Sequence, residues 1–319
     1  MLTVVALLFC VVVLFQGCES DVKCRNDSGA EVDWYILYKL PNVKDGGLSY
    51  LYMDESTGGW RRSTEKINSR SGALANTLKP LLDFYNRKTE GFGYMLYNDQ
   101  LPKQSRNQRR HTNAPSSFGH SKGGCSNVLL SQDNKALQCK QKLLAYSYDS
   151  DIPKTFPNEL RCVAQRSCYP KKKPWFREKM LTSLNGQQFH SFAKYKRFGD
   201  GECSQFQMLK FHDLYVKSWG KMRGPQIYNC GITHHVYNVK TVRPLNMQPF
   251  SDTVDHSKWC VTPDGNWTCI ADMNREKSQM YRGGGAICTN DVTVGEAFYA
   301  LIKKHEPCEH EFTVQHREL

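Results

Sequence analysis

The 319-residue sequence predicts a mixed α/β (α+β) chain built from two similar lobes. Segments rich in β-branched and aromatic residues, which favour strands, alternate with helical segments in both halves. A connection rich in Cys, Pro and Lys, roughly 151–174, separates the halves. Each half also contains one His-Ser-Lys triplet, at 120–122 and at 256–258. We therefore expect an N-terminal lobe over 21–170 and a C-terminal lobe over 171–319, each with one triplet.

The expected strands follow the aromatic and β-branched segments in both halves. In the first half they cover 32–40, 50–54, 93–98, 128–130 and 142–149. In the second half they cover 190–198, 207–219 and 232–240. Apart from the two triplets, the halves show no clear internal sequence repeat.

Two segments have the apolar spacing of an amphipathic helix. Residues 76–88 place Leu78, Leu81 and Leu82 on one face, and Pro80 is compatible with a helix only in the first turn. Residues 293–305 are the clearest predicted helix, with Thr293 and Glu296 spaced as a capping box.

The N-terminus has the pattern of a signal peptide. An apolar run covers residues 4–15, which is short for a membrane span, and small or polar residues follow it. We expect cleavage after Ser20, so that residues 1–20 are removed. Two of the thirteen cysteines leave with this peptide, and in an oxidising compartment the remaining eleven predict disulfides plus one odd thiol. The sequons at Asn26 and Asn266 agree with a secreted or lysosomal protein.

The chain is strongly basic, with 43 Lys and Arg against 31 Asp and Glu and a formal net charge of +12. Such a charge attracts polyanions such as nucleic acid, anionic lipid or sulfated glycan. Two stretches combine positive charge with an aromatic or His residue, at 106–111 and 171–179, and their leading candidates for backbone contacts are Arg109, Arg110, Lys171, Lys172 and Lys173. Solvated basic loops are the alternative for each stretch.

The two H-x-K triplets are a plausible pair of half-sites for phosphodiester chemistry. In a strand, residues i and i+2 point to the same face, which would place an imidazole beside an ammonium group. The Lys would neutralise non-bridging phosphate oxygens, and the His would attack phosphorus or donate a proton. Two such units would supply a nucleophile, a general acid and two positive charges. No Cys or His spacing typical of a zinc site occurs, so we predict no metal and no cofactor.

The sequence resembles the deoxyribonuclease II family, which is related to phospholipase D. The resemblance is carried by VDWYILYKLP, YLYMD, GYMLYNDQ, SFAKYKRFGD and above all DHSKWCVTPDGNWTCIADMNREKSQMYRGGGAIC. It covers nearly the whole mature chain and weakens in 131–188 and 200–250. It implies a phospholipase D-like fold in which each lobe has a central sheet flanked by helices. The active site would lie at the lobe interface, with DNA as a substrate bound without sequence specificity.

Carried over by position, His120 and Lys122 form the first motif and His256 and Lys258 the second. The resemblance implies metal-independent cleavage at acid pH through a phosphohistidine, giving 3′-phosphate and 5′-hydroxyl ends. Either His fits the role of nucleophile. The positive charge of a nearby lysine disfavours protonation of the imidazole and so lowers the pKa of the His, which would move activity to acid pH.

Some further roles follow from the same segments. Residues that could orient a His or hold a phosphate are Asp272, Asn274, Arg275 and Arg282, with turn formation as the equal alternative. Trp259 could stack on a base, although core packing is the stronger expectation. The resemblance favours disulfides between Cys269 and Cys288, between Cys230 and Cys308, and between Cys24 and either Cys162 or Cys168. Cys125 lies close in sequence to Cys139, its expected partner.

The chain departs from the family pattern after Lys122, where GGCSN precedes VLL and the later stretch reads KLLAYSYDS without Trp or His. A weakly active or inactive secreted protein that binds DNA or modulates immune responses is therefore the main alternative. A phosphodiesterase acting on phospholipid head groups is a third, less favoured one. The odd cysteine leaves both a monomer and a homodimer open.

Overall fold

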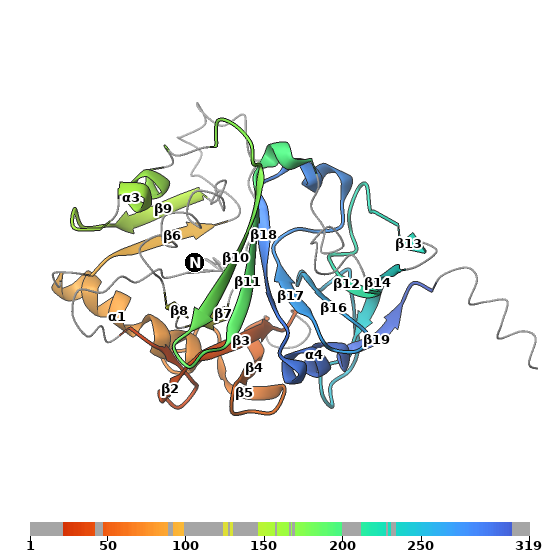
Figure 1. The fold of residues 1–319 in the computed structure, drawn as a ribbon. Coiled ribbons are helices and arrows are strands. Elements are labelled where there is room, and N and C mark those ends of the chain that lie inside the picture. Colours follow the sequence, from red (N-terminus) through yellow and green to blue (C-terminus); the bar gives the residue numbers. More distant parts are fainter. Residues whose placement is uncertain are drawn as a thin grey trace, which may run out of the picture.

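The structure is a computed structural model (Figure 1). It describes residues 22–41, 47–88, 92–98, 124–126, 128–129, 146–156, 158–165, 167, 170–199, 212–227, 229–230 and 234–307. The expected signal peptide and the first His-Ser-Lys triplet, with His120 and Lys122, lie outside these residues. Arg109, Arg110, Cys139, Cys168 and Cys308 lie outside them as well.

Short strands and few helices make up the described chain. The elements of the first half are β1 (Cys24–Arg25), β2 (Glu31–Val32), β3 (Trp34–Lys39), β4 (Ser49–Asp54), β5 (Arg61–Lys66), α1 (Ala73–Arg87), β6 (Tyr94–Asn98), β7 (Gly124–Ser126), β8 (Val128–Leu129), β9 (Tyr146–Asp151) and α3 (Asn158–Ala164). Those of the second half are β10 (Phe176–Ser183), β11 (Gln188–Lys194), η3 (Lys196–Phe198), β12 (Leu214–Lys217), β13 (Asn229–Cys230), β14 (His235–Val242), β15 (Phe250–Ser251), β16 (Trp259–Val261), β17 (Thr268–Ala271), η6 (Lys277–Tyr281), β18 (Gly284–Thr289), α4 (Val292–Tyr299) and β19 (Ile302–His305).

One large mixed sheet dominates the described residues. Its 11 strands follow the order β13-β14-β12-β16-β17-β18-β11-β10-β8, with β15 and β19 also paired to β14. The β12–β14 pair is parallel, whereas β16, β17, β18, β11 and β10 form an antiparallel run. In Figure 1 the long β10–β11 hairpin and β18 stand in the middle of the molecule. The pairing of Thr182 with Leu129 adds β8, from the first half, to this sheet.

A four-stranded sheet of order β5-β4-β3-β7 packs against the large sheet. Successive residues of a strand face opposite sides, and β3 shows this alternation. Trp34, Ile36 and Tyr38 join a core with residues of β14, β16 and α4, while Tyr35 packs on the other side with Tyr52 and the start of α1. β3 therefore has buried residues on both faces.

The first expected helix forms, but it is longer than predicted. It begins at Ala73, which places Pro80 in the helix interior and not in the first turn. An interior proline removes one backbone hydrogen bond and costs about 3 kcal/mol. The helix begins early because the Asp27 carboxylate accepts a hydrogen bond from the N–H of Ala73, at 3.0 Å. A side chain distant in sequence thus caps this helix, which local spacing could not show.

The expected C-terminal helix over 293–305 is wrong in its second half. α4 ends at Tyr299, and residues 302–305 form β19, which pairs with β14. The expected capping box is also replaced, because the helix cap is Asp291, whose side chain accepts from the N–H of Val294. Pairing with an open strand edge outweighs the helical spacing of a segment with only moderate propensity.

Most expected strands form, with different ends. The segment 32–40 divides into β2 and β3, 190–198 ends as a strand at Lys194 and continues as η3, and only Leu214–Lys217 of the described part of 207–219 is a strand. The mixed α+β class is therefore confirmed, and the two-lobe arrangement stays a prediction. Within the described residues, no helix has the length and apolar character needed to span a membrane.

Candidate active site

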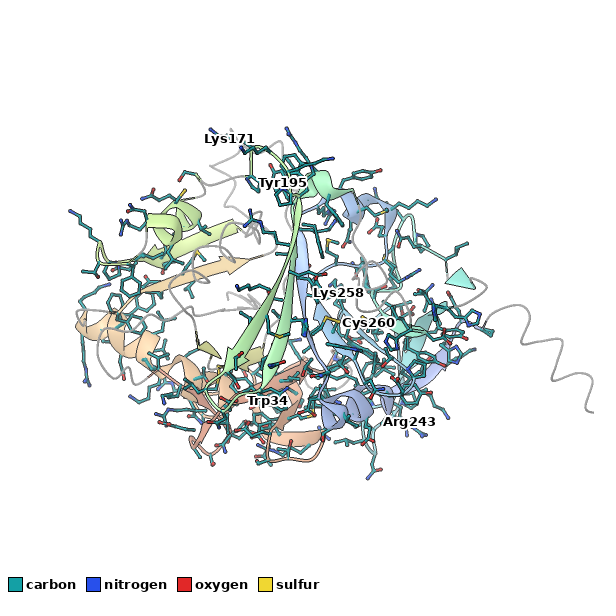
Figure 2. All side chains as sticks on the ribbon, viewed as in Figure 1. Trp34, Lys171, Tyr195, Arg243, Lys258 and Cys260 are labelled. Carbon is teal, nitrogen blue, oxygen red and sulfur yellow. A yellow bond between two sulfur atoms is a disulfide. The ribbon has the colours of Figure 1, made fainter. Side chains whose placement is uncertain are left out.

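The second H-x-K triplet lies in a short irregular segment that leads into β16. His256 is exposed, whereas the side chain of Lys258 is buried and its Nζ donates to the carbonyl oxygen of His256 at 2.9 Å. We expected a strand to place both side chains on one face, but β16 begins only at Trp259. The triplet therefore presents an imidazole at the surface above a buried cation. Lys258 lies near the middle of the large sheet (Figure 2).

A buried aspartate fixes the backbone on both sides of His256. The carboxylate of Asp255 accepts from the N–H of Ser257 at 2.9 Å and from its hydroxyl at 2.6 Å. It also accepts from Tyr38 Oη of β3 at 2.6 Å. The residue that precedes His256 is thereby tied to a strand 217 positions earlier in the chain. We call Asp255, Tyr38, Ser257 and Lys217 the Asp255 cluster.

Lys217 of β12 balances the charge of this cluster. Its Nζ lies 3.1 Å from Asp255 Oδ2 and donates to the carbonyl oxygen of Asp255 at 3.0 Å. Lys217 is fully buried. Burial lowers the pKa of Lys217, and the neighbouring Asp255 carboxylate opposes this shift. Burial and the same carboxylate raise the pKa of Tyr38, so its hydroxyl remains a donor.

The imidazole of His256 stacks on the indole of Trp219. The two ring centroids are 4.6 Å apart and the planes meet at 25°. Trp219 lies two residues after the end of β12 and is only partly buried. No sequence motif indicated Trp219, Asp255, Lys217 or Tyr38 as part of the site. Lys217 could have indicated this site from the sequence. A lysine that ends a short apolar strand needs a buried counter-charge if it points inward.

The residues predicted to support a catalytic His hold three different segments of the backbone. The buried side chain of Asn274 accepts from the backbone N–H of Trp219 at 3.1 Å, and the indole of Trp219 in turn stacks on His256. Asp272 accepts from the N–H of Gly285 at 2.8 Å and therefore holds the β17–β18 connection. A Cβ at Gly284 would lie 2.5 Å from Asp272 Oδ1, so the glycine permits this approach. Arg275 is buried and donates to the carbonyl oxygen of Ile227 at 2.8 Å.

The other predicted residues are a core tryptophan, a partly buried arginine and three exposed lysines. Trp259 is buried in the main core, as expected. Arg282 is partly buried directly after η6. Lys171, Lys172 and Lys173 are exposed, and Figure 2 shows Lys171 near Tyr195 at one end of the molecule, away from Lys258. At this end the Arg197 guanidinium lies 5.4 Å from the ring centroid of Trp175.

The disulfides agree with the expectation in one case and contradict it in two. Cys269 is bonded to Cys288 across the β17–β18 pair, as the resemblance implied. Cys24 is bonded to Cys125, so its expected pairing with Cys162 or Cys168 is wrong, as is that of Cys125 with Cys139. The cause is the pairing of β3 with β7, which places Cys125 opposite Tyr35. The Cα atoms of Cys24 and Cys125 are then 5.8 Å apart.

The remaining predictions concern glycosylation, one further disulfide and metal binding. Asn266 is exposed in a turn, whereas Asn26 is partly buried and its Oδ1 accepts from Ser28 and from the N–H of Ala30. The side chain of Cys230 is not described, and with Cys308 outside the structure that predicted bond stays a prediction. In the ranges that the structure describes, no three His, Cys, Asp or Glu side chains gather as a metal-binding group.

Comparisons with known proteins define the class of this chain. The family model described as Deoxyribonuclease II matches residues 23–136 and 130–308. The Sus scrofa deoxyribonuclease-2-alpha is 34% identical over 90% of this chain and 91% of its own length. The Rattus norvegicus deoxyribonuclease-2-alpha is 33% identical over 90% of this chain and 95% of its own length. The Homo sapiens deoxyribonuclease-2-beta is 31% identical over 90% of this chain and 92% of its own length.

The family model covers residues 23–308, and the class that it defines is a DNA hydrolase. The chain belongs to the deoxyribonuclease II family.

Proposed function

We propose that this protein is an acid, metal-independent endonuclease that hydrolyses DNA to 3′-phosphate and 5′-hydroxyl ends. The observation that carries the proposal is the exposed imidazole of His256, held above the buried Lys258 and Asp255 in a chain of the deoxyribonuclease II family. An imidazole in this setting has access to a large substrate, while a fixed cation close to it supplies a positive field.

The reaction uses one His as nucleophile and the other as general acid. The nucleophile, His120 or His256, forms a bond from a ring nitrogen to phosphorus as the bond from phosphorus to the 5′-oxygen breaks. The second His donates its proton to that leaving oxygen. Water then attacks the phosphohistidine, the nitrogen–phosphorus bond breaks, and the second His takes the proton from water. The 3′-phosphate leaves and both His return to their starting states. Lys122 neutralises the phosphate oxygens, and the buried Lys258, whose Nζ donates to the carbonyl oxygen of His256, adds a positive field at the site.

This mechanism requires the two triplets to meet, and the strand register around β3 supports such a meeting. Gly124, two positions after Lys122, lies opposite Ile36 in the β3–β7 pair. Two positions further along β3, Tyr38 donates to Asp255, the neighbour of His256. Strand β3 therefore contacts Gly124, close in sequence to the first triplet, and also Asp255, the residue before the second triplet. We infer a phospholipase D-like arrangement in which lobes 21–170 and 171–319 bring the triplets together.

DNA binding is assigned to exposed basic side chains that contact the phosphate backbone. Lys171, Lys172 and Lys173 are exposed next to Trp175 and Arg197, and Arg109 and Arg110 add positive charge before the first triplet. Contacts of this kind do not depend on base sequence and weaken steeply with salt. They suit a nuclease without sequence preference.

We infer that the protein acts in a lysosome or outside the cell after removal of residues 1–20. The Cys24–Cys125 and Cys269–Cys288 bonds support this location, because such bonds persist in oxidising compartments. The exposed sequon at Asn266 suits glycosylation better than that at Asn26, which is partly buried.

The deciding experiment is plasmid nicking at pH 5 and pH 7.5 with EDTA present, followed by analysis of the product ends. The purified full-length chain is compared with His120→Ala, His256→Ala and the control His234→Ala. His234 lies 4.0 Å from Asp213 at the start of β14, and the mechanism gives it no role. We expect cutting at pH 5 with 3′-phosphate ends, lost in the first two variants and kept in the control.

A folded wild type that binds DNA but leaves the plasmid intact at both pH values contradicts the proposal. The chain would then be a DNA-binding member of the family without turnover, which is the alternative that the altered stretch after Lys122 raises.

A further inference from the structure

The plane of the His256 ring is restrained by the indole of Trp219. The terminal torsion of a histidine is broad, so rotamer preference alone does not fix the direction of an exposed imidazole. The Asp255 cluster holds the backbone before and after His256, but a fixed backbone does not fix the ring plane. The stacked indole, with centroids 4.6 Å apart and planes at 25°, supplies that restraint.

Trp219 is itself held at both ends. Its backbone N–H donates to Asn274 Oδ1 at 3.1 Å, and its indole Nε1 donates to the carbonyl oxygen of Thr253 at 3.0 Å. Thr253 lies two residues before Asp255, so the indole and the His256 segment share one support. Ring and backbone of Trp219 are therefore anchored to two different segments of the chain.

The residue after Trp219 shows how closely these segments approach. Gly220 N–H donates to the carbonyl oxygen of Asp252 at 3.0 Å, and a Cβ at Gly220 would lie 2.5 Å from the Asp252 carboxylate. Asp252 is buried and paired with Lys240 at 2.6 Å, so it has little room to move. Glycine at this position allows the turn that places the indole under His256.

We propose that Trp219 is a positioning residue for the reaction, with Asn274 and Thr253 fixing the indole and the indole fixing the imidazole plane of His256. The proposal rests on the proposed function, because it assigns the orientation of one of the two catalytic His. Trp219 acts through His256 and needs no contact with the phosphate. A small misdirection of a reacting group costs up to about 100-fold in rate, so this restraint bears on turnover more than on binding.

The first test measures the stacking without reference to activity. In the full-length protein with isotope-labelled His, the ring protons of His256 are assigned by their loss in His256→Gln. A proton above an indole face resonates upfield, so Trp219→Leu should move the His256 signals downfield, and Trp219→Phe should move them less. Unchanged His256 signals in Trp219→Leu, with a native spectrum elsewhere, overturn the proposal.

The second test separates positioning from general damage. We expect Trp219→Leu to lower kcat for plasmid nicking by about 10- to 100-fold with KM changed less than about twofold, and Trp219→Phe to recover part of the loss. The matched control is Trp267→Leu, which removes a partly buried Trp that contacts His190 edge to face at 5.1 Å. This control keeps the Asn266 sequon and should keep kcat. Equal losses in both Trp variants overturn the proposal.

Failure of the two assignments can be told apart. A wild type without nicking activity refutes the proposed function, and the His256 signals still decide whether the stacking exists. An active wild type whose kcat is unchanged in Trp219→Leu refutes the positioning role alone.

Discussion

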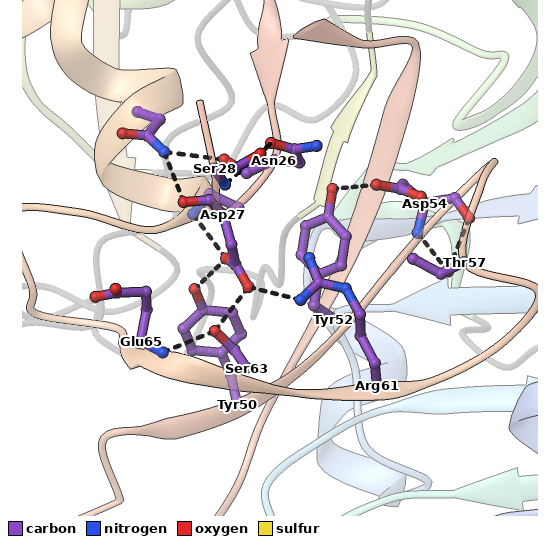
Figure 3. Close-up of polar contacts among 12 residues, drawn as sticks. Asn26, Asp27, Ser28, Tyr50, Tyr52, Asp54, Thr57, Arg61, Ser63 and Glu65 are labelled. Atoms are coloured by element: carbon purple, nitrogen blue, oxygen red, sulfur yellow. Dashed lines mark hydrogen bonds and ion pairs between the residues drawn. The ribbon is translucent and has the colours of Figure 1, made fainter. Parts of the chain in front are cut away.

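Two aspartates each organise a cluster of polar contacts, one in the first half of the chain and one beside His256. Asp27 accepts from Tyr50 Oη at 2.6 Å, Ser63 Oγ at 2.7 Å and the N–H of Ala73 at 3.0 Å, and it pairs with Arg61 at 3.1 Å (Figure 3). Asp255 has a similar set, with a tyrosine hydroxyl, a serine, a backbone N–H and a cation. The two carboxylates thus have nearly the same partners.

The clusters differ in where their cations lie. The side chain of Arg61 is 42% exposed, whereas that of Lys217 is 0% exposed. Water can solvate Arg61 if Asp27 is lost, but nothing comparable can solvate Lys217 without Asp255. The contacts also serve different ends, because Asp27 caps α1 and Asp255 precedes His256. The same chemistry therefore supports a helix in one place and a candidate catalytic segment in the other.

The largest effect is expected from Asp255→Ala, which removes the carboxylate that pairs directly with the buried Lys217. We expect a loss of about 3–5 kcal/mol in the free energy of unfolding and no detectable nicking. Urea unfolding and the plasmid assay measure the two effects. Adding Lys217→Met to Asp255→Ala should recover part of the stability but no activity. A double variant that is no more stable than Asp255→Ala would show that the uncompensated charge is not the cause.

A smaller effect is expected from Asp27→Ala. Several hydrogen bonds and the cap of α1 are lost, but Arg61 stays in water, so we expect about 1–3 kcal/mol. Urea unfolding measures the change, and hydrogen exchange should locate it at the start of α1. The kcat of the folded fraction should equal that of wild type. A fall in kcat as large as for Asp255→Ala would remove the distinction between the two clusters.

The two tyrosines sharpen the comparison, because each hydroxyl donates to its aspartate at 2.6 Å. Tyr38→Phe and Tyr50→Phe should each cost about 1 kcal/mol in unfolding free energy. Only Tyr38→Phe should also lower kcat, because Tyr38 holds the residue next to His256. The two variants are compared by denaturant melts and initial rates at pH 5. Equal kcat values would mean that Asp255 keeps its position without Tyr38.

The smallest effect is a dependence of stability on pH. Burial opposes the charge of Asp27, but hydrogen bonds from Tyr50, Ser63 and the N–H of Ala73, with the Arg61 charge, hold its pKa below the ordinary value. Folding therefore favours the carboxylate. The ionised Asp27 stabilises the folded state fully above the pKa of the unfolded chain, about 3.9, and this stabilisation is lost as the pH falls through the pKa of the folded protein. Urea unfolding between pH 7 and pH 2 should show this loss, and Asp27→Asn should reduce the slope below about pH 4.

The sequence predicted the mixed class and most strands, because alternation and aromatic content are local properties. It misjudged α1 and β19, since Asp27 caps the helix from 46 residues away and β19 forms by pairing with β14. It selected His256 and Lys258 through their motif. It missed Trp219, Lys217 and Tyr38, which reach the site only through the fold. The pairing of Cys24 with Cys125 likewise depends on β7 lying beside β3.

The Cys24–Cys125 bond joins two positions that are 101 residues apart. Cys24 comes four residues after the expected end of the signal peptide, so the bond encloses about a third of the residues that follow this point. One peptide-bond cleavage anywhere inside this span would leave both pieces covalently joined. In surroundings rich in proteases, a single cut there would therefore not release a fragment, and the molecule would appear shortened only on a reducing gel.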